Sequence, residues 1–133
     1  MSDGGPGRLL AAIYALFALA AGARSGAQIA TDFSAAPLPY ALSALAAVVY
    51  LVIALTISSE SPQRRLIARI GCALELTGVL AVGTASLLDP GAFPDQTVWS
   101  GFGEGYGWVP LLLPCAGLLW LSRPSGACAS SRP

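Results

Sequence analysis

The sequence predicts an all-α, membrane-embedded four-helix bundle, and two observations about composition and pattern carry this prediction. Hydrophobic residues make up 55% of the 133 residues and charged residues only 11%, whereas a soluble domain has about 25% Asp, Glu, Lys and Arg. The apolar residues gather in four long segments, at about 9–30, 40–57, 67–88 and 107–121. Four buried helices of a soluble protein are the alternative, but this chain has too little polar surface to cover them in water. We therefore expect one transmembrane domain, residues 1–123, in contact with a lipid bilayer.

The first three segments are long enough to cross a membrane as helices. A bilayer core about 30 Å thick needs about 20 residues at 1.5 Å each. The first segment contains Arg24 and Gln28, the second has no charge, and the third carries Glu75. The first segment could also be a cleaved signal peptide with Ala21-Gly22-Ala23 as its cleavage site. The apolar residues that continue past Arg24 favour a span.

The fourth segment is short and contains two prolines. Fifteen residues of helix cover about 22 Å, so this span must tilt little, thin the bilayer or begin earlier in the preceding glycine-rich stretch. We expect Pro110 and Pro114 to kink the helix or to restrict it to the part after Pro114. The tail, residues 124–133, is expected to be disordered.

The arginines predict the direction of each span. The chain has no lysine, and six of its seven cations fall at the ends or in the second connection: Arg8, Arg64, Arg65, Arg69, Arg123 and Arg132. The first and third connections carry only acidic residues: Asp32, Asp89, Asp95 and Glu104. The positive-inside rule then places both termini and the 58–65 connection in the cytoplasm. In that connection, Ser61 is the expected N-cap and Pro62 the first residue of the third helix.

The third connection, residues 89–106, is the longest and combines glycines with aromatic residues. Glycines at 101, 103, 105 and 107 alternate with Phe102, Tyr106 and Trp108, and Trp99 precedes them. We interpret this pattern as a cap at the headgroup level, on the side opposite to the arginines. A functional loop is the alternative, and its candidate residues are Asp32, Asp89, Asp95, Glu104, Trp99 and Tyr106.

Arg24 and Glu75 lie within spans, where an ionisable residue is a functional candidate. Arg24 lies about 22 Å from the arginine-rich face and Glu75 about 12 Å, so the two should not pair. We expect Arg24 to reach outwards to Asp32, Asp89 or Glu104. Gln28 is the remaining polar candidate in the first span.

At the depth of Glu75, the count of residues gives Tyr14 and Tyr50 as partners. Because burial disfavours a charged carboxylate, we expect a neutral Glu75 that donates a hydrogen bond between helices, worth about 1 kcal/mol. A proton or cation relay, or a contact with an arginine of a partner subunit, are the alternatives.

Other chemistry has little support in the sequence. Histidine is absent, which removes the usual metal ligand and general base, and a net charge of zero argues against nucleic acid. Cys72, Cys115 and Cys128 form no C-x-x-C motif, so a thiol oxidoreductase is disfavoured. A carboxylate-only cation site remains open at the outer acidic residues. We expect no metal, no cofactor and no catalytic residue.

The residues from Glu75 to Trp120 carry a resemblance to a known family. They read Glu-Leu-Thr-Gly-Val-Leu, Leu-Leu-Asp-Pro and Val-Trp-Ser-Gly-Phe-Gly-Glu-Gly-Tyr-Gly-Trp-Val-Pro-Leu-Leu-Leu-Pro. This half of the chain resembles a family of small four-span membrane proteins of actinobacteria. The resemblance implies a location in the plasma membrane and brings no activity.

Three functions are compatible with these features, and an enzyme that acts on a lipid substrate through Asp89 or Asp95 is the third. We expect a structural or accessory membrane protein that forms a homo- or hetero-oligomer through small-residue helix faces, at Gly22 and Gly26 and at Gly71 and Gly78. The alternative is a small proton-coupled transporter that uses Glu75. The chain is similar in size to small multidrug exporters, but their essential carboxylate lies in the first span, where this chain has Arg24.

Overall fold

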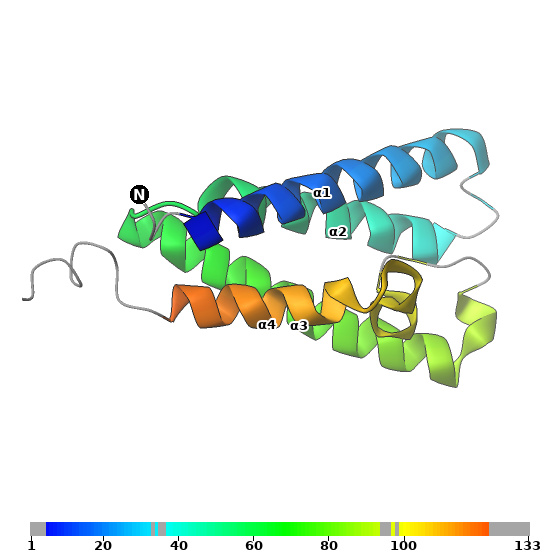
Figure 1. The fold of residues 1–133 in the computed structure, drawn as a ribbon. Helices are drawn as coiled ribbons and strands as arrows, with labels where there is room; N and C mark the ends of the chain where they lie inside the picture. The colour runs from blue at the N-terminus through cyan, green and yellow to red at the C-terminus, as the bar shows by residue number, and fades with distance from the viewer. Residues whose placement is uncertain (1–4, 33, 35–36, 94–96, 98, 123–133) are drawn as a thin grey trace, which may run out of the picture.

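The computed structural model describes residues 5–32, 34, 37–93, 97 and 99–122, and these residues form an all-α protein (Figure 1). Four helices and two short 3-10 helices follow in this order: α1 (Gly5–Asp32), α2 (Pro37–Thr56), α3 (Pro62–Leu88), η3 (Pro90–Ala92), η4 (Ser100–Tyr106) and α4 (Val109–Leu121). The expectations for Asp95, for Cys128 and for the tail, residues 124–133, lie outside the described residues.

The four helices run alternately up and down. The start of α1, the end of α2, the start of α3 and the end of α4 lie at the same end of the molecule, on the left of Figure 1. We call this the basic end, because it carries Arg8, Arg64, Arg65 and Arg69. In the same view, α4 lies beside α3 and is much shorter than α3. The 3-10 helix η4 lies next to the first residues of α4, which it precedes in the chain.

Three helices, α1, α2 and α3, are long and apolar enough to cross a membrane. The apolar helix α4 has 13 residues and covers only about 20 Å. Large apolar side chains on all four helices are more than half exposed: Leu9, Leu16, Leu19, Leu45, Leu55, Leu66, Leu88 and Leu119. A surface of this kind is typical of contact with lipid rather than with water, and the chain is a multi-pass membrane protein.

Helix α4 includes both of its prolines, so the expectation of a helix only after Pro114 is wrong. Pro110 lies in the first turn, where the missing N–H would have no partner in any case. Pro114 lies inside the helix and removes one hydrogen bond to the preceding turn. Both prolines are fully buried, and this burial stabilises α4 although Pro114 interrupts its hydrogen-bond ladder.

The connection between α3 and α4 folds back into the bundle. Trp99 is 3% exposed, and its ring packs on Gly78 of α3, where an added Cβ would lie 2.7 Å from the indole. Phe102 packs in the same way on Gly83. These glycines precede the end of α3 by ten and five residues, which corresponds to about 15 Å and 8 Å along the helix. The glycines of α3 thus leave room for both rings inside the protein, while the position of this connection at the headgroup level stays a prediction.

The backbone of this re-entrant segment, residues 97 and 99–108, is irregular, so its buried N–H and C=O groups need hydrogen-bond partners outside a helical ladder. Its residues 101, 102, 103, 107 and 108 have positive φ, and two of them, Phe102 and Trp108, are not glycine. Ser86 of α3 accepts a hydrogen bond from the Gly101 N–H at 2.9 Å. Within the segment, Ser100 and Thr97 side chains accept bonds from the N–H groups of Thr97 and Trp99. Hydroxyl groups of serine and threonine thus accept hydrogen bonds from backbone N–H groups that have no helical partner.

Side chains also complete the helix ends at the basic end. Arg65 and Arg69 of α3 donate to the carbonyl oxygen of Leu121, at 3.0 and 2.7 Å, where the last carbonyls of α4 carry partial negative charge. The Trp120 indole N–H donates to the Ile57 carbonyl oxygen after α2, at 3.1 Å. Helix α3 begins at Pro62 with Ser61 at the N-cap, but the Ser61 side chain makes no capping bond.

Candidate functional site

Glu75 lies in the centre of the bundle, where it is fully buried. The Tyr14 hydroxyl of α1 donates a hydrogen bond to Glu75 Oε1 at 2.7 Å. The second carboxyl oxygen, Oε2, has no hydrogen-bond partner among the described residues, and Glu75 forms no ion pair with them. Arg24 is accordingly not its partner.

A glycine of α4 provides the space next to this bond. The Tyr14 hydroxyl lies 3.7 Å from the Cys72 sulfur of α3. At Gly117, an added Cβ would lie 2.8 Å from that sulfur and 3.6 Å from the Tyr14 oxygen. Three helices therefore meet at Tyr14, and a side chain at position 117 would separate them.

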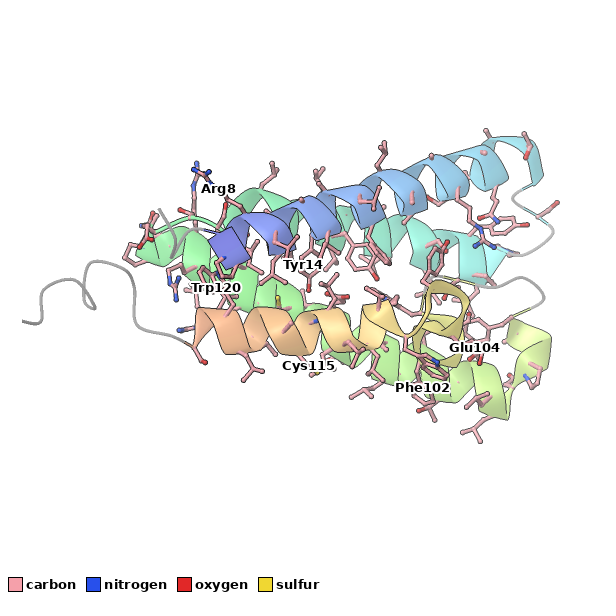
Figure 2. The ribbon with its side chains drawn as sticks, viewed as in Figure 1. Arg8, Tyr14, Phe102, Glu104, Cys115 and Trp120 are labelled. Carbon is pink, nitrogen blue, oxygen red and sulfur yellow. The ribbon has the colours of Figure 1, made fainter. Side chains whose placement is uncertain are left out.

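Tyr50 and Trp99 extend the polar contacts towards the re-entrant segment. The Trp99 indole N–H donates to the Tyr50 hydroxyl at 3.0 Å, and Tyr50 interacts electrostatically with Glu75. The rings of Tyr14 and Tyr50 are 5.9 Å apart, and those of Tyr50 and Trp99 are 6.5 Å apart. We call Tyr14, Tyr50, Cys72, Glu75 and Trp99 the buried polar cluster. Figure 2 shows Tyr14 directed into the bundle.

Trp99 is the member of this cluster that the sequence did not indicate. The count of residues gave Tyr14 and Tyr50 the same depth as Glu75, and the structure brings these three together. Trp99 was expected in an outer loop, but its ring enters the protein at Gly78. Glycines spaced along α3 were the signal for this approach, although such spacing is common in membrane helices for other reasons.

Arg24 has a partner on the re-entrant segment. Its Nη1 donates to the Tyr106 hydroxyl at 3.2 Å, and the expected contact of Arg24 with Asp32, Asp89 or Glu104 stays a prediction. The Phe17 ring lies between Tyr106 and Tyr50, 5.8 Å from each. An aromatic row thus leads from the buried polar cluster to Arg24.

The other candidates lie apart from this cluster. Gln28 is on the same helix as Arg24, one turn further on, and has an interaction of its own. Asp32 is the last residue of α1, and Asp89 follows α3, where its N–H donates to the Ala85 carbonyl oxygen. Glu104 is exposed and lines a cavity of about 180 Å³ beside Ser86 and Ser100.

The described residues hold few groups for metal or redox chemistry. They include no set of three His, Cys, Asp or Glu side chains that could hold a metal ion. Cys72 is a buried free thiol and Cys115 an exposed one. The chemistry that the site offers is therefore hydrogen bonding and proton binding at one buried carboxyl group.

Comparison with known protein families, curated proteins and solved structures finds no match. The resemblance to a family of actinobacterial membrane proteins consequently has no support beyond the residues that suggested it. At the level that the helices establish, the chain is a small multi-pass membrane protein.

Proposed function

We propose that this chain is a structural or accessory membrane protein, a subunit or partner of a membrane complex. The observation that carries the proposal is that the buried polar side chains are hydrogen-bonded to one another. Glu75 is fully buried and bonded to Tyr14, and Tyr50 is bonded to Trp99. These bonds join α1, α2 and α3 to the re-entrant segment, so the interior holds the bundle together. Such a protein acts through its lipid-facing surface.

The proposed arrangement has four spans in the plasma membrane, with both termini and the 58–65 connection in the cytoplasm. The clustering of Arg8, Arg64, Arg65 and Arg69 at one end supports it. We expect a reporter that is active only in the cytoplasm to be active when it is fused after Pro133. A reporter that is active only outside the cell should be inactive at the same position. Activity of this second reporter would contradict the orientation.

Oligomer formation through small residues now has support on α1 alone. Gly71 and Gly78 of α3 receive the side chains of Ile53 and Trp99 from the same chain, so their small faces serve packing within the bundle. Gly22 lines an apolar groove of about 370 Å³ between α1 and α2, and Gly26 has open space around its Cβ position. A second helix could approach α1 closely at these two glycines.

A proton-coupled transporter is the second candidate, and one observation favours it. Glu75 Oε2 is buried without a hydrogen-bond partner in the described part of the chain. A buried polar atom without a partner costs about 1–3 kcal/mol, and such exceptions in membrane proteins often mark proton pathways.

One purification experiment separates the two functions. The protein is expressed at its native level and purified in mild detergent. It is then reconstituted into vesicles, and uptake driven by a proton gradient is measured. A stable partner in a fixed ratio supports the accessory role. A homodimer whose uptake is abolished by Glu75→Gln, but not by the control Glu104→Gln at an exposed carboxylate, supports transport. A monomer without partner and without uptake would contradict both.

A further inference from the structure

A cavity at the basic end combines positive charge with an adjoining apolar groove. It has a volume of about 270 Å³ and is lined by Glu60, Pro62, Arg65, Leu66 and Arg69. Two arginines and one glutamate give this lining a net charge of +1. The cavity lies on the first two turns of α3, a helix of 27 residues. In the proposed arrangement these turns lie at the level of the lipid headgroups, because 27 residues cover about 40 Å and the hydrocarbon core only about 30 Å.

The two arginines are held in place by the end of α4. Both donate to the one carbonyl oxygen of Leu121, which places two guanidinium groups within about 6 Å of each other around a neutral acceptor. Arg69 makes no other hydrogen bond with the described residues, and a guanidinium has five N–H donors in a fixed geometry. Since the side chains are already ordered, an anion that binds them pays little additional conformational entropy.

An apolar path leads away from this cavity along α3. Leu66, which lines the cavity, is followed at four-residue intervals by Ile70 and Leu74, and the three are 55%, 52% and 56% exposed. Ile70 and Leu74 also line a groove of about 350 Å³ against Val49 and Val52 of α2. A phosphate group in the cavity would therefore be followed by an apolar surface in the direction of the membrane interior.

We propose that Arg65 and Arg69 form a binding site for the phosphate headgroup of an anionic phospholipid, with an acyl chain along Leu66, Ile70 and Leu74. Planar guanidinium groups bind phosphate oxygens through two parallel hydrogen bonds. The apolar groove selects a lipid over a free phosphate, because an inorganic ion would leave this surface unused. The site does not depend on which of the two proposed functions is correct.

Lipid retention measured by native mass spectrometry tests the site. The full chain is purified from an equimolar mixture of phosphatidylglycerol and phosphatidylcholine in mild detergent, and retained lipids are counted. The unchanged chain is expected to retain phosphatidylglycerol preferentially. Arg69→Gln is expected to reduce this retention about tenfold, the equivalent of one lost charge-assisted hydrogen bond.

Two further variants give the experiment its controls. Arg64→Gln removes the same charge from the same turn, but Arg64 does not line the cavity, so retention should change less than about twofold. Glu60→Gln removes the one negative charge from the lining and is expected to raise retention. This variant also tests the site if Arg69→Gln fails to fold.

Three results would overturn the proposal. Equal losses in Arg64→Gln and Arg69→Gln would mean general attraction to the basic end. Unchanged or weaker retention in Glu60→Gln would mean that the cavity does not hold the headgroup. Displacement of the lipid by millimolar inorganic phosphate would mean an anion site without a role for the acyl groove.

Discussion

Replacement of Gly78 by alanine is expected to destabilise the protein by about 1–3 kcal/mol, the usual cost of overpacking a tight interior. A Cβ at this position would lie 2.7, 2.8 and 3.0 Å from three atoms of the Trp99 ring. The ring must then move outwards, and its hydrogen bond to Tyr50 is lost. In an open helical position, replacement of glycine by alanine stabilises a protein by about 0.5–1 kcal/mol. A decrease in the free energy of unfolding would therefore indicate that Trp99 packs on Gly78.

The measurement combines denaturant unfolding with fluorescence of a chain in which Trp108 and Trp120 are phenylalanine. Gly78→Ala should shift the emission of Trp99 to longer wavelength, because the indole becomes more exposed. Gly5→Ala is the control, since an added Cβ there meets nothing within 4 Å. If both variants behaved alike, the re-entrant segment would not pack on α3 as described.

Tyr14→Phe is expected to cost about 1–3 kcal/mol, because it leaves the buried Glu75 carboxyl without its hydrogen-bond donor. Glu75 Oε2 already has no partner within the described residues, so this variant deprives both carboxyl oxygens. Glu75→Gln keeps an oxygen that can accept from Tyr14 and should be the mildest substitution at position 75.

A double-mutant cycle isolates the energy of this pair. In a Glu75→Leu background there is no carboxyl to satisfy, so Tyr14→Phe should cost much less than in the unchanged chain. We expect a coupling of about 0.5–3 kcal/mol, measured by unfolding in detergent or bicelles. Additive effects would show that Tyr14 and Glu75 do not depend on each other.

The helices could be predicted from the sequence because hydropathy and length determine them independently of tertiary contacts. The third helix shows where the apolar pattern is insufficient. The apolar segment was placed at 67–88, but α3 begins at Pro62, since the polar residues before Ile67 continue the same hydrogen-bond ladder outside the hydrocarbon. The proline at position 62 was the correct signal for this start.

The candidate site was predictable only where helical geometry fixes depth. A rise of 1.5 Å per residue gave Tyr14, Tyr50 and Glu75 a common level. No such rule applies to residues 89–108, whose positive-φ residues bend the chain back towards α3. The positions of Trp99 and Tyr106 therefore depend on tertiary packing, and the Arg24–Tyr106 bond could not be derived from spacing.

The dependence of the re-entrant segment on α3 sets an order for biogenesis. The Gly101 N–H has its acceptor on Ser86, and Phe102 has its place at Gly83. A nascent chain that released α4 into lipid on its own would expose this backbone to hydrocarbon without those partners. We therefore expect α3 and α4 to leave the insertion machinery together and to enter the bilayer as one hairpin.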